Sequence, residues 1–289
     1  MIDSPEFREL LHKKFPVLDK GFVCLMDAMG SDHEICEAAR TSYGKGTKSV
    51  SDDRTLIRHM FRHHHSTPFE MAEVRLLIQM PMDCHRQQIR HRTASVCEYS
   101  TRFSEAIDDK QETSPDQWRS QSTANKQGSS GFLGKAEGRV LSHAEARLHR
   151  HATDIYQVRL AVGVAREQAR KDLPLSTYTR YNWKIDLHNL LHYLGLRMDS
   201  HAQHEIRQYA NVIGNEIVAK LFPDCWEAFV DYQHEAVTFS RLELDALKSA
   251  FNQVCWDSRL GIASDNKREQ EEFRDKLIRL GFKVGGIKP

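Results

Sequence analysis

Residues 90–102, "RHRTASVCEYSTR", are rich in basic and hydroxyl side chains. The basic residues of this segment are Arg90, His91, Arg92 and Arg102. Like charges at this spacing repel one another, and Glu98 is the single carboxylate among them. The hydroxyl group of Ser100 and the guanidinium group of Arg102 are the kinds of group that bind phosphate. The segment therefore predicts a site for a phosphate-bearing ligand.

Further arginines stand where a folded chain could add them to the same site. Arg166 and Arg170 are spaced i,i+4, so one helix would place them on one face, and Arg197 lies in a later predicted helix. The sequence contains neither a G-x-G-x-x-G motif nor a P-loop motif, so a glycine-rich turn does not hold the phosphates. We therefore expect side chains from distant segments to hold a nucleotide.

Overall charge separates a small anionic ligand from a polyanion. The 289 residues carry a formal net charge of +1, whereas a general nucleic-acid binder or membrane binder would carry a large basic excess. We therefore expect neither as a partner. No apolar run reaches the roughly 18 residues of a membrane span, and "MIDSPEFREL" lacks the apolar core of a signal peptide. Six scattered cysteines without a C-x-x-C pair favour reduced thiols and a cytoplasmic location.

Histidines at metal-like spacing offer an alternative chemistry. His188 and His192 are spaced i,i+4, and residues 63–65 are consecutive histidines. A catalytic zinc helix of the H-E-x-x-H type needs a glutamate where this chain has Asn189. Consecutive residues of a helix point in different directions, so at most two of the three histidines could share an ion. We therefore expect no metal site.

The pattern of apolar residues predicts the elements that position these side chains. Apolar residues at helical spacing, several behind Ser or Asp caps, predict helices over residues 31–43, 51–64, 82–92, about 142–171 and 187–222, the last broken near Gly195. Alternating or apolar runs predict strands over residues 71–81 and 178–186.

The rest of the chain adds little regular pattern. Residues 105–143 are polar and rich in Gly, Ser and Gln, which predicts a loop or insertion, and residues 240–289 are expected to form a C-terminal helical extension. No internal repeat or linker is evident. We therefore expect an α+β fold, with residues 1–289 as a single compact, helix-rich domain around a central, mostly antiparallel sheet.

Three separate blocks of the sequence resemble one enzyme family. "RHRTASVCEYS" contains R-H-R, seven further residues and Ser100, which is similar to the signature of the flavin-dependent thymidylate synthases. "HHSTPFE" (64–70) resembles the His-x-Thr-Pro-Phe-Glu segment of that family, and residues 166–210 resemble its C-terminal core. The chain departs from the family at Cys97, where Asn is more usual, and in the polar segment 105–143.

The resemblance implies a reaction and an assembly. The family converts dUMP to dTMP with methylenetetrahydrofolate as carbon donor, while NADPH reduces a bound FAD. The resemblance also implies a homotetramer whose active sites are built from more than one subunit. On this interpretation the arginines gather because the FAD pyrophosphate and the dUMP phosphate enter one cleft together.

The resemblance also assigns roles to individual residues. Arg197 corresponds to a catalytic arginine that contacts the uracil, and Thr67, with His65 nearby, corresponds to a residue that reaches the FAD of another subunit. Ser100 matches a binding position, and no histidine–carboxylate partner marks it as a nucleophile. The dUMP positions are Gln87, Arg90, Glu98, Ser100, Arg102, Arg170 and Arg197. The FAD positions are His65, Thr67, Arg90, His91, Arg92, Glu98, Asp186, His188 and His192.

Two other classes of function compete with this interpretation. The first is a flavin- or nucleotide-binding paralogue without methyl transfer, and the presence of Arg197, Ser100 and residues 90–92 counts against it. The second is a helical protein that binds RNA through its arginines, and the net charge of +1 counts against it.

Overall fold

The computed structural model describes the chain apart from residues 1–3, 42–51, 124–127, 252–261, 263–265 and 281–289. The chain divides into two compact units, Met1–His234 and Glu235–Pro289. The second unit contains the helices α11 (Arg241–Phe251) and α12 (Lys267–Arg279). All strands of the described chain and every residue of the predicted site lie in the first unit.

A five-stranded antiparallel sheet organises the first unit, in the order β1-β2-β3-β7-β4. Its strands are β1 (Lys14–Val17), β2 (Gly21–Met29), β3 (Glu73–Pro81), β4 (Ser95–Glu98) and β7 (Tyr178–Asp186). The central antiparallel sheet and the mixture of helix and sheet confirm the predicted α+β class. The strands predicted from alternation are β3 and β7, and they pair along their full length from Glu73 opposite Asp186 to Pro81 opposite Tyr178.

Alternation along β7 decides which side chains enter the core. Tyr181, Trp183 and Ile185 are buried on one face, whereas Arg180 and Lys184 are exposed on the other. Successive side chains of a strand point to opposite faces, so a single apolar period of two gives both a core side and a polar side. The buried face packs into one continuous hydrophobic core that also includes the helical residues Leu190 and Tyr209.

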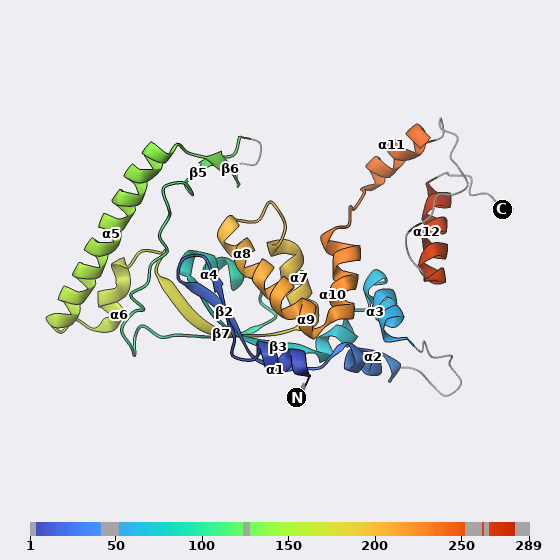
Figure 1. Ribbon diagram of the computed structural model, residues 1–289, viewed down its shortest axis with the longest axis horizontal. Coiled ribbons are helices and arrows are strands. Elements are labelled where there is room, and N and C mark those ends of the chain that lie inside the picture. The colour runs from blue at the N-terminus through green and yellow to red at the C-terminus, as the bar shows by residue number, and fades with distance from the viewer. Residues whose placement is uncertain (1–3, 42–51, 124–127, 252–261, 263–265, 281–289) are drawn as a thin grey trace. The chain divides into compact units, whose positions relative to one another are not determined.

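Helices cover the apolar side of the sheet. In Figure 1, α7 (Leu187–Arg197) and α8 (His204–Val212) lie over the strands, and α8 contacts β1 and β2. The other elements of this unit are α1 (Pro5–Leu10), α2 (Asp32–Arg40), α3 (Asp53–Arg62), η1 (Thr67–Met71), α4 (Met82–Gln88), β5 (Arg119–Gln121), β6 (Ser129–Phe132), α5 (Lys135–Ala161), α6 (Arg166–Ala169), η2 (Arg170–Asp172), η3 (Ile213–Val218), α9 (Ala219–Leu221), α10 (Pro223–Phe229) and η4 (Val230–His234). No helix of the described residues is long and apolar enough to cross a membrane.

Two predicted helices end earlier than expected, and both changes affect the site. The predicted helix over 82–92 stops at Gln88, so residues 90–92 follow the helix and do not lie on it. The helix predicted over 142–171 runs from Lys135 to Ala161 instead. Gly163, with φ of 83°, ends it, because the amides of Gly163 and Val164 bond back to the carbonyls of Leu160 and Arg159. Arg166 and Arg170 therefore lie on a separate short helix: Arg166 begins α6, and Arg170 is its C-cap, whose backbone N–H bonds to the Arg166 carbonyl one helical turn earlier.

Polar segment 105–143 contains regular structure. Its strands β5 and β6 pair as an antiparallel hairpin, and α5 begins inside its C-terminal part. The amide of Gln111 bonds to the carbonyl of Ser176, and the amide of Tyr178 bonds to the carbonyl of Asp109. Backbone hydrogen bonds therefore tie the start of this segment to β7.

Asp186 links the sheet to the helix that carries Arg197. One carboxylate oxygen accepts from the backbone N–H of Asn189 at 2.9 Å, and the other accepts from the Asn189 side chain at 2.8 Å.

Asp186→Ala removes this N-cap, which typically contributes about 0.5–2 kcal/mol, whereas Asp186→Asn keeps an equally good cap. We expect urea unfolding of the flavin-free protein to show this loss in the Ala variant and near-normal stability in the Asn variant. Equal losses in both variants would show that the carboxylate charge, and not the cap, stabilises α7.

Candidate functional site

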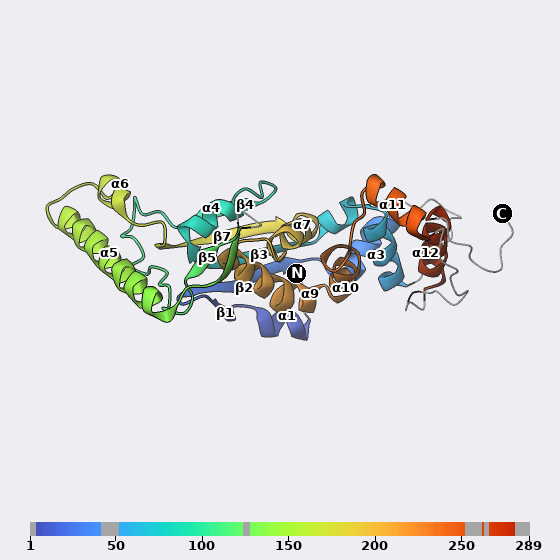
Figure 2. The ribbon, with the colours of Figure 1, turned by 90° about the horizontal axis from the view of Figure 1, so that it is seen from above.

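Most of the predicted site residues come together at the β4 side of the sheet. They come from the end of α4 and the segment after it, from β4 and the turn that follows, from η2, and from α7. Figure 2 shows α4 and β4 beside β7, and both elements contact that strand. Side-chain hydrogen bonds then join these elements across long stretches of sequence.

The R-H-R segment and α7 meet through one side-chain pair. The Nε of Arg197 donates to Nε2 of His91 at 3.1 Å. The His91 ring also packs edge-on against Tyr193, with centroids 4.9 Å apart, and its centroid lies 6.1 Å from that of His192. The predicted catalytic arginine thus lies directly against the predicted FAD segment.

His91 is neutral at ordinary pH. Loss of hydration, the positive charge of Arg197 and the neighbouring His192 together lower the pKa of His91 to about 4. A neutral imidazole has one nitrogen that can accept a hydrogen bond. Because the Nε2 of His91 accepts from Arg197, its proton lies on Nδ1. His91 therefore orients the guanidinium group without adding a second positive charge.

β4 and its turn place Glu98 against buried polar groups. A carboxylate oxygen of Glu98 accepts from the Thr179 hydroxyl at 2.6 Å and lies 3.7 Å from Nδ1 of His85. Burial lowers the pKa of His85 below its ordinary value, while the nearby Glu98 carboxylate opposes that shift. Thr179 and His85 are both buried, so they fix one side of the exposed Glu98 side chain.

The turn after β4 binds to the segment that carries Arg170. Nη1 of Arg170 donates to the buried hydroxyl of Thr101 at 2.5 Å. The backbone N–H of Arg102 donates to the Ser100 hydroxyl at 3.3 Å, which closes the turn. Arg102 also pairs with Glu167 at 3.3 Å, but both side chains are more than half exposed, and such pairs are weak. The structure therefore gathers Ser100, Arg102 and Arg170 around one turn.

Arg90 and Arg92, between α4 and β4, are exposed, and neither guanidinium has an ion-pair partner among the residues that the structure describes. His188 and His192 lie on successive turns of α7, on the same helix as Arg197. Guanidinium groups pair with phosphate through forked N–H donors, so Arg90 and Arg92, two positions apart in the sequence, are suitable donors for a pyrophosphate. The donor set therefore matches the FAD that the sequence predicts.

His65 and Thr67 come from the segment between α3 and η1 and from the start of η1. Thr67 begins η1, both side chains are exposed, and η1 contacts α7 and β7 of the same chain. Within the described part of the chain, no hydrogen bond or ion pair joins either residue to residues 90–102. Their predicted contact with FAD on another chain stays a prediction.

Sequence reasoning missed several residues of the site. Thr101 had a usable signal, since it is a hydroxyl residue between two predicted phosphate ligands. Thr179 lies within a predicted strand, and His85 lies within a predicted helix, and neither position carries a motif. Thr179 and His85 are 81 and 13 positions from Glu98 in the sequence, so local sequence patterns do not predict these contacts.

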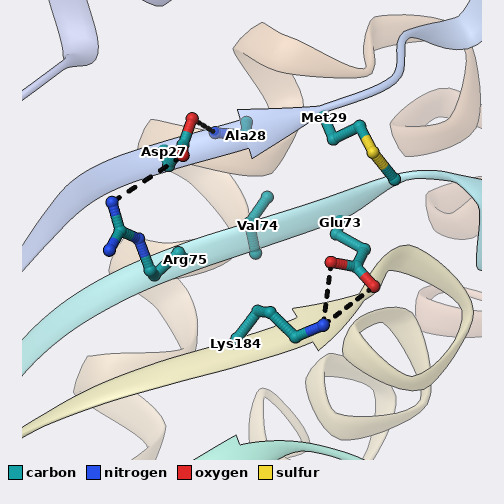
Figure 3. Close-up of a pocket in the computed structure, with 7 residues that line it drawn as sticks. All are labelled: Asp27, Ala28, Met29, Glu73, Val74, Arg75 and Lys184. Atoms are coloured by element: carbon teal, nitrogen blue, oxygen red, sulfur yellow. Dashed lines mark hydrogen bonds and ion pairs between the residues drawn. The ribbon is translucent and has the colours of Figure 1, made fainter. Parts of the chain in front are cut away.

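A cavity on the polar side of the sheet has no part in the predicted site. It measures about 270 Å³ and is lined by Asp27, Ala28, Met29, Glu73, Val74, Arg75 and Lys184 (Figure 3). Its charged groups pair across strands, Arg75 with Asp27 at 3.7 Å and Lys184 with Glu73 at 3.0 Å. The two basic and two acidic side chains balance, so the lining of the cavity has no net charge that would favour an ionic ligand.

Comparisons with known proteins identify the family of the chain. Residues 24–224 match the family model Thy1, described as thymidylate synthase complementing protein. A flavin-dependent thymidylate synthase of Ehrlichia ruminantium (strain Gardel) is 46% identical over 276 residues, which cover 94% of this chain and 91% of that protein. The enzyme of the same name from Thermus thermophilus is 44% identical over 260 residues, covering 89% of this chain and 94% of that protein.

Two solved structures of one UMP/dUMP methylase are also similar to this chain, at lower sequence identity. The UMP/dUMP methylase PolB from Streptomyces cacaoi, bound with 5-Br dUMP, superposes with a TM-score of 0.67 at 28% identity, covering 76% of this chain and 99% of that one. Its complex with 5-Br UMP gives a TM-score of 0.65 at 29% identity, covering 75% and 97%. The matched family region, the extent of the relatives and the side-chain cluster described above lead to one conclusion: the chain belongs to the flavin-dependent thymidylate synthase family.

Proposed function

We propose that this chain converts dUMP to dTMP, with methylenetetrahydrofolate as the carbon donor and NADPH-reduced FAD as the reductant, in dTTP biosynthesis. The observation that supports this proposal is the Arg197–His91 hydrogen bond, which joins the arginine predicted to be catalytic to the segment that also contains Arg90 and Arg92. The relatives named flavin-dependent thymidylate synthase and the UMP/dUMP methylase structures support the same chemistry.

FAD fits the donor groups of the chain. Arg90 and Arg92 would bind its pyrophosphate, while His91, His188 and His192 would line the flavin side together with Asp186 and Glu98. When bound, FAD supplies the redox chemistry of the reaction. The protein's part is to hold the two ligands in contact and to balance their negative charges with its arginines.

The dUMP phosphate would bind at the turn after β4. Ser100 and Arg102 of this turn offer a hydroxyl and a guanidinium group, and Arg170 of η2, bonded to Thr101 of the turn, offers a second guanidinium group. Arg170 is already anchored by Thr101, so its guanidinium group loses little freedom when a ligand binds. Arg90, Gln87 and Glu98 would then contact the sugar and the base.

Arg197 would act on the uracil ring. Carbon 5 of uracil becomes a better nucleophile when negative charge builds on the N3/O4 side of the ring. A guanidinium group does not lose its proton at working pH, so Arg197 serves as a fixed positive charge and a fork of donors. His91 accepts one N–H of this fork and leaves the others for the ring. In a cleft from which ligands exclude water, such a charge stabilises a developing anion strongly.

The working assembly would be a homotetramer in the cytoplasm, with no nucleic-acid or membrane partner. His65 and Thr67 would reach the FAD of a neighbouring subunit, so each active site would take residues from more than one chain. The unit Met1–His234, which contains the family match, would supply all of these residues, and residues 240–289 would be a C-terminal helical extension.

A flavin-binding paralogue without methyl transfer is the less favoured alternative. Such a protein would keep the FAD donors but would have no reason to keep Arg197 hydrogen-bonded beside them. The hydrogen bond to His91 supports the active enzyme over this alternative.

Arg197 variants test the activity itself. Tritium release from [5-³H]dUMP should require NADPH, FAD and methylenetetrahydrofolate, and Arg197→Ala should slow it by about 10²–10³-fold, as for loss of one comparable donor. The variant should keep its FAD and still be reduced by NADPH. Arg197→Lys should recover only part of the rate, because an ammonium group lacks the planar fork. Normal tritium release by the Ala variant would remove Arg197 from the mechanism.

The phosphate contact can be tested at Arg170. A charge-assisted hydrogen bond contributes about 1.5–3 kcal/mol, so Arg170→Ala should raise the dUMP dissociation constant roughly 10- to 150-fold. Deoxyuridine, which lacks the phosphate, should bind equally to both proteins in isothermal titration. Thr101→Val is the matched control, since it removes the anchoring hydrogen bond and keeps the guanidinium group. A full loss in the Thr101 variant would mean that the turn, and not the charge of Arg170, binds dUMP.

The neutral state of His91 predicts how the stability of the folded protein changes with pH. Its pKa in the folded chain is about 4, below the ordinary 6.5, so the unfolded chain takes up the proton first as pH falls. The stability contribution is therefore complete above about pH 6.5 and is lost as pH falls toward 4. NMR titration of the His91 ring should give a pKa near 4, and Arg197→Gln should raise it by removing a nearby positive charge. A His91 pKa near 6.5 in the parent protein would contradict the neutral acceptor.

A further inference from the structure

A chain of three hydrogen bonds connects Gln87 to the polar segment 105–143. The side-chain N–H of Gln87 donates to the side-chain oxygen of Gln203, which directly precedes α8. The side-chain N–H of Gln203 donates to one carboxylate oxygen of Glu205 at 2.9 Å. Nη2 of Arg119, in β5, donates to the other oxygen of Glu205 at 2.5 Å.

Glu205 determines which groups donate and which accept in these hydrogen bonds. Only 7% of Glu205 is exposed. Burial favours the neutral acid, but the hydrogen bonds from Arg119 and Gln203 outweigh it and hold the pKa of Glu205 below its ordinary value. An ionised carboxylate can only accept hydrogen bonds. Gln203 must therefore turn its NH₂ group toward Glu205.

The orientation of Gln203 in turn fixes the orientation of Gln87, which is predicted to bind dUMP. Once the NH₂ group of Gln203 faces Glu205, its oxygen faces Gln87 and can only accept. Gln87 must then present its own NH₂ group to Gln203, which leaves Oε1 of Gln87 as an open acceptor. Within the described chain, this oxygen has no hydrogen-bond partner. A reversed amide would offer two N–H donors there instead.

We propose that Arg119, Glu205 and Gln203 form a positioning relay that orients the Gln87 amide, so that its oxygen accepts a hydrogen bond from bound dUMP. The proposal rests on the proposed function, because it takes Gln87 as a dUMP ligand. It gives the 105–143 segment a role, since Arg119 of β5 fixes the buried end of the relay. At neutral pH, dUMP has two donors that could meet the oxygen, the uracil N3–H and the ribose 3′-hydroxyl.

Glu205→Gln tests the relay with little change of shape. The new amide can donate to Gln203 and so permits the reversed orientation of Gln87. We expect the dUMP dissociation constant, measured by perturbation of the bound flavin spectrum, to rise roughly 2- to 13-fold, as for loss of one neutral hydrogen bond worth about 0.5–1.5 kcal/mol. Arg119→Gln should act in the same direction. FAD content should stay normal in both variants.

A double-mutant cycle separates the relay from a structural effect. In a Gln87→Ala background, Glu205→Gln should cause no further loss of dUMP affinity, because the relay acts only through Gln87. Glu216→Gln, in an exposed pair with Lys220, is the matched control and should bind dUMP normally. An equal loss from Glu205→Gln in both backgrounds would overturn the relay, and so would normal affinity in the Glu205 and Arg119 variants.

Two modified nucleotides identify the donor. If N3–H is the donor, N3-methyl-dUMP should bind equally to the parent and to Glu205→Gln; if the 3′-hydroxyl is the donor, 2′,3′-dideoxy-UMP should do so. A loss that persists with both nucleotides would contradict the relay. If Gln87→Ala binds dUMP normally, both the Gln87 contact and the relay fail. Tritium release by the parent protein tests the proposed enzyme activity separately.

Discussion

The pairing of β7 with β3 on one side and β4 on the other is the constraint on which the site depends. β3 and β7 form nine consecutive residue pairs, which makes β7 a rigid central strand. The short, exposed β4 has little apolar surface of its own, so its place is set by its pairing with β7. At its start β7 provides Thr179 for Glu98, and at its end Asp186 caps the helix that carries Arg197.

Cationic side chains on the polar side of the sheet have partners within the chain. Arg75 and Lys184 pair with carboxylates, and Arg180 donates to the side-chain oxygen of Gln79. Arg90 and Arg92 have no such partner among the described residues, and the nearby His91 is held neutral. Anionic ligands would balance the local excess of positive charge, which explains why a nearly neutral chain concentrates arginines in residues 90–102.

Neighbouring polar side chains hold the charged groups of the predicted site in place. Thr101 anchors Arg170, His91 orients Arg197, and Thr179 and His85 flank Glu98. Buried hydroxyl and imidazole groups suit this task because they hold a charged partner by a directional bond and add no charge of their own. The proposed relay through Glu205 extends the same arrangement to Gln87.

The sequence by itself determined the elements whose patterns are local. Alternation predicted β3 and β7, helix caps and apolar spacing predicted α2 and α3, and the R-H-R signature predicted the family. Tertiary structure decided the rest. β2 is buried almost continuously along its first residues, so it shows no alternation, and β4 is four residues long. The contacts of Arg197 with His91 and of Arg170 with Thr101 join residues 106 and 69 positions apart. The periodic pattern of apolar residues along a helix or strand predicts which face of that element a side chain lies on. Only the packing of the elements against one another decides which side chains come into contact.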